Sequence, residues 1–305
     1  MTTESTFIEL MRAIASDPAA RGLADDVAVV DLGTESLIIT HDMMAEDVHW
    51  LPSADAADVA WKLVSVNLSD LAAKGAAPIG VLLGFMLGED SWDRRFAEGL
   101  GEVLRYYDVP LLGGDTVANR GDKRSVGLTA LGRATTRPVP SRSGARAGDI
   151  LYVTGTLGDA LAGFEFAEVG LEGLPETMAV YHRPVARLAD GQALAAAVSA
   201  MMDVSDGLLI DAERMAAASG VGMQIDLAAI PLSMSYRQQR GDSLDSRIQA
   251  ASWGDDYQLL FTATAAQNLP VEATAIGQVV PGYGLSLSDG ETPVPLPQKL
   301  GFEHR

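Results

Sequence analysis

The chain has 305 residues, no cysteine and a formal net charge of −19, with 22 lysines and arginines against 41 aspartates and glutamates. This acidic balance argues against nucleic acid or an anionic membrane as the principal partner, and an anionic ligand would need cations to mediate its binding. The lack of cysteine excludes disulfides, thiolate catalysis and cysteine-ligated metal centres. The length predicts two domains.

The first half of the chain mixes helix and strand patterns. Residues 1–20 are expected to form an amphipathic helix rather than a signal peptide, because acidic side chains interrupt the apolar ones. Short apolar runs predict strands at 27–31, 36–40, 109–112 and 123–133 and a buried strand at 79–87, with helices at about 60–75 and at 93–107. No run is long enough to span a bilayer, so we expect a soluble protein, and the lack of cysteine fits a cytoplasmic location.

Residues 134–148 combine prolines, glycines and small polar residues, and they are the best candidate linker. They divide the chain into expected domains at 1–137 and 138–305. The second half predicts strands at 149–154, 222–227 and 257–262, helices at 158–169, 184–198 and 208–218, a partly helical stretch at 233–252, and a poorly patterned tail at 285–297. The predicted fold class is α/β (α+β): an N-terminal mixed sheet with flanking helices, followed by a C-terminal α/β domain whose sheet is covered by helices.

Asp70 places a carboxylate inside a segment that otherwise has the pattern of a core-facing helix. Asn67 lies three residues earlier and therefore projects beside it, while Gly75 and Pro78 predict the end of the helix. A carboxylate beside an apolar face is costly unless it is hydrogen-bonded, paired or bound to a metal. Taken alone, a hydrogen bond to a nearby backbone amide explains Asp70 equally well.

Other acids share this setting, because each lies at the end of a predicted strand or on a helix beside one: Asp25, Asp26, Asp42, Asp70, Asp115, Asp203 and Asp206. Strand ends form ligand crevices in layered α/β folds, so a shared site is plausible. Converging carboxylates repel one another unless cations are bound. Oxygen ligands with few histidines indicate Mg²⁺, Mn²⁺ or Ca²⁺, and separate acids favour Mg²⁺ completed by phosphate oxygens. Helix capping is the alternative for any one of them.

Familiar nucleotide and nucleophile motifs are missing from the sequence. It contains neither the G-x-x-x-x-G-K-[ST] of a P-loop nor the G-x-S-x-G of a serine hydrolase, and with four histidines it has little material for a histidine-rich site.

Several segments, in this order, resemble thiamine-monophosphate kinase over nearly the whole chain. They include Asp25-Asp26, Thr40-His41-Asp42, His49-Trp50, Asn67-Leu68-Ser69-Asp70-Leu71-Ala72-Ala73-Lys74-Gly75, Gly113-Gly114-Asp115-Thr116, Ser141-Arg142-Ser143-Gly144, Asp203-Val204-Ser205-Asp206-Gly207, Trp253-Gly254-Asp255-Asp256-Tyr257 and Gly301-Phe302-Glu303-His304. The family belongs to the superfamily typified by aminoimidazole ribonucleotide synthetase. The resemblance implies two α/β domains, a homodimer formed through the N-terminal domain, and ATP binding without a P-loop.

The resemblance also implies a reaction, the transfer of a phosphoryl group from ATP to thiamine monophosphate with several Mg²⁺ ions held by aspartates. The implied metal positions are Asp26, Thr40, Asp42, Asp70, Asp115, Asp203 and Asp206, of which we expect Asp42, Asp70 and Asp206 to be catalytic. The implied ATP contacts are Gly114, Asp115, Arg142 and Ser205. The implied thiamine-phosphate contacts are His49, Asp255 and Phe302, and an aromatic ring such as Phe302 can stack on the cationic thiazolium.

The sequence departs from the family pattern mainly on the acceptor side. His41 stands where threonine is usual, Asp255 where glutamate is usual, and Asp47 where glycine is expected. Two alternatives therefore stay open: an enzyme of the same fold with another small phosphorylated acceptor, and a non-catalytic protein that binds nucleotide or thiamine phosphate.

Overall fold

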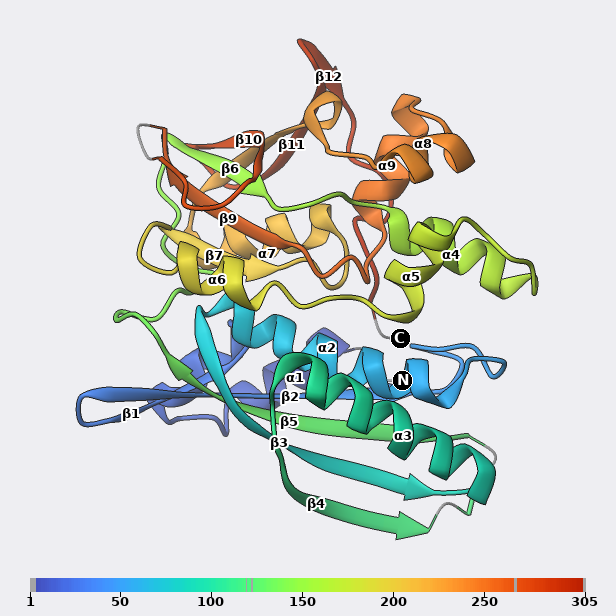
Figure 1. Ribbon diagram of the computed structural model, residues 1–305. Helices are drawn as coiled ribbons and strands as arrows, with labels where there is room; N and C mark the ends of the chain where they lie inside the picture. Colours follow the sequence, from blue (N-terminus) through green and yellow to red (C-terminus); the bar gives the residue numbers. More distant parts are fainter. Residues whose placement is uncertain (1–3, 119, 122, 266–267, 304–305) are drawn as a thin grey trace.

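The computed structural model describes residues 4–118, 120–121, 123–265 and 268–303 as two lobes stacked on each other (Figure 1). His304, the last residue of the resembling segments, lies outside this range. Each lobe has its own mixed sheet, so the predicted α/β class with two sheet-containing parts is confirmed. Among the described residues no helix is both long and apolar enough to cross a membrane.

The first sheet has five strands in the order β1-β2-β5-β3-β4, and β3 and β4 form its parallel pair. Their bounds are Ala28–Leu32 for β1, Glu35–Ala45 for β2, Ala76–Leu87 for β3, Leu111–Ala118 for β4 and Ser125–Ala134 for β5. β1 and β2 pair with each other and correspond to the apolar runs that predicted strands at 27–31 and 36–40. β4 lies at the edge, and all eight of its residues are exposed.

Helix α2 (Ala56–Ala73) belongs to the first lobe and lies between the two lobes. It begins at Asp55, whose side chain accepts the Ala57 amide, and the chain leaves it through Gly75 at φ +59°, a left-handed turn that glycine adopts without strain. One side packs on β2 and β5, and another packs on the second lobe. As a result 16 of its 18 residues are buried, more than the amphipathic stripe predicted.

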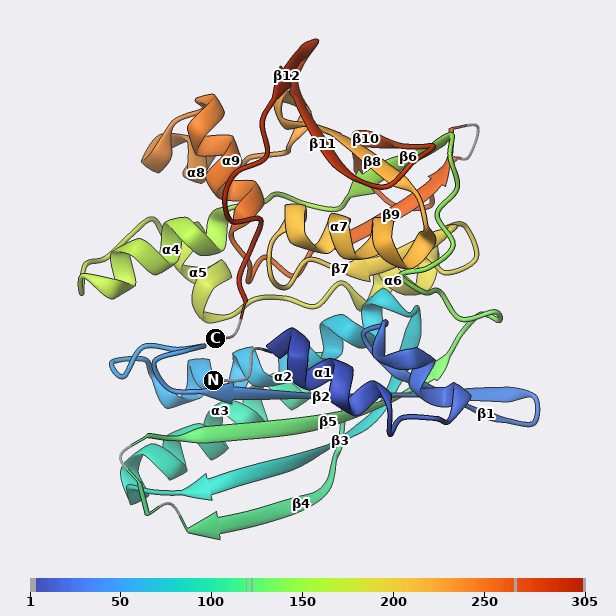
Figure 2. The same ribbon diagram turned by 180° about the vertical axis from the view of Figure 1, so that it is seen from behind.

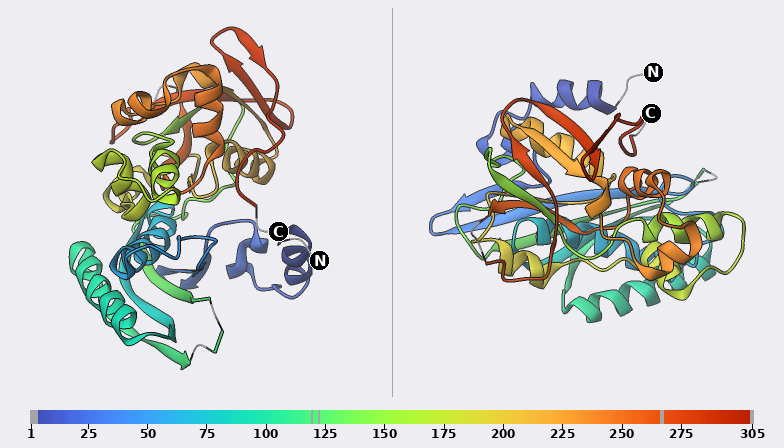
Figure 3. Two further views of the ribbon diagram at one scale, coloured as in Figure 1. Left: turned by 90° about the vertical axis from the view of Figure 1, so that its right-hand side faces the viewer. Right: turned by 90° about the horizontal axis from the view of Figure 1, so that it is seen from above.

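The other helices of the first lobe lie on opposite sides of its sheet. They are α1 (Glu4–Arg12), the short helix η1 (Pro18–Leu23) and α3 (Asp90–Tyr107). Figure 2 shows α1 from behind, and the side view in Figure 3 places α1 and α3 on the two sides of the lobe.

The second lobe has a seven-stranded sheet in the order β12-β11-β8-β10-β6-β9-β7. Its strands are β6 (Asp149–Val153), β7 (Ala200–Asp203), β8 (Gly222–Asp226), β9 (Leu259–Thr264), β10 (Thr274–Val280), β11 (Gly284–Asp289) and β12 (Thr292–Val294). Its helices are α4 (Asp159–Glu168), α5 (Pro175–His182), α6 (Leu188–Leu194), α7 (Leu208–Ser219), η2 (Leu227–Ala229), α8 (Met234–Arg240) and α9 (Leu244–Ser252).

The two lobes touch most closely where α6 crosses the end of α2. A Cβ atom on Gly191 of α6 would lie 1.9 Å from the Ala72 carbonyl oxygen of α2. Two atoms that are not bonded to each other cannot lie this close, so only glycine, which has no Cβ atom, permits this approach.

Some sequence-based predictions of single elements were wrong. The strand at 79–87 is half exposed rather than buried, with Ile79, Leu82 and Leu87 each more than a third exposed. Gly113, Gly114 and Asp115 lie inside β4 rather than after a strand. The helix predicted at 184–198 is only 188–194, and α5, β7, β10, β11 and β12 had not been predicted. The candidate linker 134–148 is free of helix and strand beyond Ala134, and the boundary at 137/138 stays a prediction.

Candidate active site

Three carboxylates converge where α2 meets the second lobe. One oxygen each of Asp26, Asp70 and Asp203 lie within 4.8 Å of one another. Asp26 precedes β1, Asp70 lies in the last turn and a half of α2, and Asp203 ends β7. Three segments that are far apart in the sequence therefore bring their acids to one point.

Hydroxyl groups hold two of these acids. The Ser69 hydroxyl donates a 2.5 Å hydrogen bond to Asp203, and the Thr40 hydroxyl donates one to Asp70. Asp70 is thus bonded to a side chain of β2 and not to a nearby backbone amide. It lies too far from the start of α2 to cap the helix, so neither local explanation of Asp70 holds.

Asp42 and Asp206 flank this group. The Asp42 amide donates to the Asn67 side chain at 3.0 Å, which places Asn67 and Asp70 on the same face of α2, as their spacing predicted. Asp206 is paired with Arg214, and Asp211 accepts the amides of Ser205 and Asp206 at 3.1 Å each. Asp206 itself does not cap α7 with its side chain.

Asp26 is surrounded by cationic groups. The Arg142 Nε donates to Asp26 Oδ1 at 2.7 Å, and the buried Lys74 ammonium contacts Oδ2. Asp26 Oδ2 is buried, and apart from this ammonium contact it has no partner in the described part of the chain.

Burial and mutual repulsion raise the pKa values of the acids. Burial raises the pKa of Asp203 to about 8 with a further contribution from Asp26, and it raises the pKa of Asp42 to about 6 with contributions from Asp26 and Asp206. Burial holds the pKa of Asp70 well above its usual range, and repulsion from Asp42, Asp203 and Asp26 adds to this effect. The charged forms of these groups are therefore unfavourable unless a cation joins them.

These residues fit a hard divalent cation. The donors are all oxygen atoms, and three of them are close enough to share one ion. Mg²⁺ and its relatives prefer such carboxylate ligands and complete their shell with water or phosphate oxygens.

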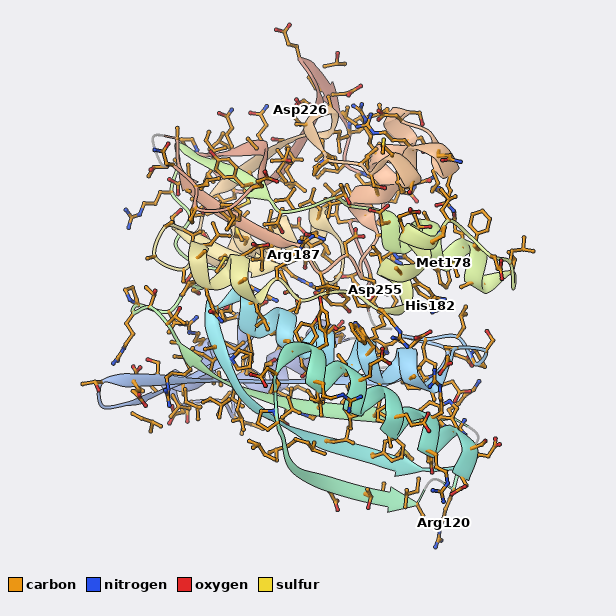
Figure 4. All side chains as sticks on the ribbon, in the orientation of Figure 1. Arg120, Met178, His182, Arg187, Asp226 and Asp255 are labelled. Atoms are coloured by element: carbon orange, nitrogen blue, oxygen red, sulfur yellow. The ribbon has the colours of Figure 1, made fainter. Side chains whose placement is uncertain are left out.

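A second group of side chains lies nearer the start of α2, beside a cleft between the lobes. The Lys62 ammonium donates to Asp255 at 2.7 Å and to the His49 carbonyl at 3.2 Å, and it lies 5.0 Å from the centre of the Tyr181 ring. Two of the three predicted acceptor-site residues are therefore joined through Lys62. Figure 4 labels Asp255, His182 and Met178 at this boundary between the lobes.

A neighbouring cavity of about 260 Å³ is lined by Leu51, Ser53, Ala54, Asp55, Asp58, Ala167, Met178 and His182. Asp47, which stands in place of an expected glycine in the same loop, has φ +66°. Aspartate tolerates this left-handed region better than most residues, which explains why the substitution is accommodated.

Phe302 lies next to the loop that carries Asp206. Its amide donates to the Asp206 carbonyl at 2.9 Å, and its ring is 39% exposed with the Lys299 ammonium 5.7 Å from the ring centre. The ring is therefore not an ordinary buried aromatic. The Asp255 amide likewise donates to the Ser205 carbonyl at 2.8 Å, so the acceptor-side and acid-side segments share one backbone network.

Gly114 and Asp115 are not brought to the acids within one chain. Asp115 pairs with Gly84 of β3, and β4 is separated from β2 by two strands. At about 4.8 Å per strand this places Asp115 roughly 14 Å from the row of Asp42.

Several residues of the site were not predicted, namely Lys62, Lys74, Ser69, Tyr181, Asp211 and Arg214. Lys62 and Lys74 could have been noticed as basic residues within a strongly apolar helix pattern. Tyr181 carries no comparable signal, because α5 itself is weakly patterned.

Comparisons with known proteins place the chain in a family. Residues 24–134 match the family model described as AIR synthase related protein, N-terminal domain, and residues 146–290 match its C-terminal domain. The thiamine-monophosphate kinases of Salmonella typhimurium and Escherichia coli K12 are 38% and 37% identical to it, each over 93% of this chain and 91% of the relative.

Solved structures agree. The structure of AaThiL complexed with AMPPCP and TMP has a TM-score of 0.89 at 31% identity and covers 99% of this chain and 97% of that one. Thiamine-monophosphate kinase from Stenotrophomonas maltophilia K279a has a TM-score of 0.77 at 32% identity, with 93% and 95% covered. The chain is therefore an enzyme of the thiamine-monophosphate kinase family.

Proposed function

We propose that this enzyme transfers a phosphoryl group from ATP to thiamine monophosphate and so forms thiamine diphosphate. The observation that carries the proposal is the convergence of Asp26, Asp70 and Asp203 from three distant segments. A site that handles two polyanions needs positive charge, and a chain of net charge −19 has to recruit it.

The cofactor part of the proposal is a group of Mg²⁺ ions. Asp26, Asp70 and Asp203 would hold them, together with Thr40, Asp42 and Asp206 around this group. When bound, such ions neutralise phosphate oxygens and orient them for in-line transfer. The raised pKa values of Asp42, Asp70 and Asp203 support this, because a cation would restore their charged forms.

The nucleophile in this proposal is a phosphate oxygen of the substrate, which is already ionised at neutral pH. A general base is therefore unnecessary, and the protein has to position the groups and stabilise the charge. Arg142 is suited to phosphate oxygens through its planar guanidinium, and Ser205 lies next to the acids on the same loop as Asp206. Asp42, Asp70 and Asp206 are the proposed catalytic carboxylates.

The acceptor would bind on the side of His49, Asp255 and Phe302. The pairing of Lys62 with Asp255 fixes that carboxylate beside the cleft, and the exposed Phe302 ring offers a face for the cationic thiazolium. Asp255 also has φ +67° beside a buried Tyr257 at φ +48°. Unusual backbone of this kind gathers at ligand sites.

We further propose a homodimer built on β4, with the domains divided near residue 137. The strand is an exposed edge, and Leu111, Leu112 and Val117 are each about half exposed on it. Exposed edges of this kind are usually covered by a partner. Gly114 and Asp115 would then lie at the interface and contribute to ATP and metal binding from the partner copy. Cytoplasm, where ATP is supplied, is the proposed location.

The direct test is the reaction itself. Purified protein with ATP, Mg²⁺ and thiamine monophosphate should form thiamine diphosphate and ADP in equal amounts, as measured by chromatography. If no product forms and calorimetry detects neither ligand, the proposal is wrong. Turnover of ATP with another phosphorylated acceptor in a screen, or thermal stabilisation by the ligands without ADP release, would instead support one of the two alternatives.

A further inference from the structure

Lys74 is a fully buried lysine one helical turn after Asp70 on α2. Its ammonium lies 2.6 Å from Asp25 Oδ1, contacts Asp26 Oδ2, and donates to the Met201 carbonyl at 3.2 Å. Met201 belongs to β7, two residues before Asp203. The ammonium therefore contacts both the loop that carries Asp26 and the strand that carries Asp203.

The environment keeps this lysine charged. The carboxylates of Asp25 and Asp26 both contact the ammonium, Asp25 at 2.6 Å, and opposite charges this close favour its charged form. Asp25 is also bonded to Arg21 at 2.5 Å and to Ser141 at 2.7 Å, so its charge is well compensated without any metal. Asp26, by contrast, pairs through Oδ2 with Lys74 and has an oxygen within 4.8 Å of an oxygen of Asp70 and of Asp203.

We propose that Lys74 is a built-in cation of the acidic site. It is a positioning residue that holds Asp26 toward Asp70 and Asp203 and supplies one fixed positive charge that the site would otherwise have to draw from solution. The inference rests on the metal-binding part of the proposed function and adds to it a role for this residue.

Two physical consequences separate this role from simple packing. A fixed ammonium partly compensates the charge of the acids before any metal binds, so the carboxylates of the metal-free protein repel one another less. The gain in stability when Mg²⁺ binds is correspondingly smaller than it would be without Lys74. Loss of the lysine should therefore be compensated by Mg²⁺, whereas loss of mere packing should not.

The test compares the melting temperatures of wild type and Lys74→Met in chelator, in MgCl₂, and in MgCl₂ with the ATP analogue AMPPCP. The variant should melt lower than wild type in chelator, and the rise produced by Mg²⁺ should be at least about twofold larger than in wild type. Calorimetry should show that the variant binds more Mg²⁺ ions than wild type, or that its binding depends more steeply on Mg²⁺ concentration.

Because Lys74→Met leaves buried acids uncompensated and can prevent folding, the double variant Lys74→Met, Asp25→Asn removes one charge of each sign. It should fold and keep the enlarged response to Mg²⁺. Lys62→Met is the matched control, since Lys62 is a second buried lysine of α2 paired with Asp255. Its loss of stability should not be restored by Mg²⁺.

An equal rise with Mg²⁺ in wild type and in both Lys74 variants would overturn the inference alone. A wild-type protein whose melting temperature does not respond to Mg²⁺, with or without AMPPCP, would overturn it together with the proposed metal site.

Discussion

The Ser69 hydroxyl donates a 2.5 Å hydrogen bond to the Asp203 carboxylate, and so it joins α2 of the first lobe to β7 of the second. Both side chains are buried, Ser69 completely. The bond therefore fixes one acid of the site against the helix that carries another.

Ser69→Ala should weaken the fold and the activity together. Loss of a donor to a buried carboxylate costs about 1–3 kcal/mol in unfolding free energy. Loss of a residue that orients a proposed metal ligand should lower kcat by about 10-fold or more. Urea unfolding and steady-state kinetics measure the two effects. Ser65→Ala is the control, because Ser65 is equally buried on α2 but bonds to Tyr107 at 3.1 Å, and it should lose stability without losing kcat.

Asp70→Asn should abolish turnover without weakening the metal-free protein. The change removes a carboxylate that burial and three neighbouring acids disfavour, while the amide oxygen can still accept from Thr40. We expect kcat to fall at least about 100-fold and the melting temperature in chelator to stay the same or rise. Asp108→Asn, at an exposed helix end with φ +53° that asparagine also tolerates, should change neither quantity. Normal turnover of Asp70→Asn would contradict the assignment.

The stability of the metal-free protein should fall as the pH rises from about 5 to about 8. The folded-state pKa values of Asp42 and Asp203 are raised to about 6 and about 8 from 3.8, so across this window the folded chain binds more protons than the unfolded chain. The free energy of unfolding then decreases with pH, as thermal melts in chelator can measure. Asp25 acts in the opposite direction, because its pKa is lowered, but only at more acidic pH. Asp203→Asn should flatten the dependence, and a stability that rises across this window would contradict it.

Asp255→Ala should weaken the binding of the acceptor more than the binding of ATP. The change removes the partner of Lys62 beside the cleft, so the KM for thiamine monophosphate should rise by about 10-fold or more, while the KM for ATP stays close to wild type. Measuring both constants in one series provides the control. Equal increases in the two KM values would show that Asp255 supports the fold of the whole site rather than the acceptor.

Asp115 should act from the partner chain. In that case a mixture of Asp115→Asn and Asp70→Asn chains, each inactive alone, would form mixed dimers with one intact site. After unfolding and refolding together, an equal mixture should recover roughly a quarter of wild-type activity, because half of the dimers are mixed and one site in two is intact in each. No recovery despite dimer formation in sedimentation would contradict action from the partner.

The sequence allowed much of the first lobe to be predicted, because β1, β2, α2 and α3 have clear periodicity. The segment around Asp70 could also be recognised, since a carboxylate stands out in an apolar helix. The convergence of Asp26, Asp70 and Asp203 could only be suggested, because it depends on how the two lobes pack.

Other features could not have been predicted for identifiable reasons. β10, β11 and β12 are short strands in a region whose prolines and glycines mask their alternation. α2 has the composition of a helix with one apolar face, yet a second lobe covers its polar residues too. The pairing of Lys74 with two aspartates depends on tertiary contacts between residues about 50 positions apart, which no local pattern contains.

The close approach of Gly191 to Ala72 holds the two lobes together at the end of α2. The start of the helix is held as well, because Arg183 pairs with Asp58 and the Trp61 indole donates to the Pro184 carbonyl at 3.0 Å. Asp58 and Ala72 are 14 positions apart, about 21 Å along the helix. The second lobe is therefore attached at both ends of this length, and the acids that meet at Asp70 are held in place by the chain itself.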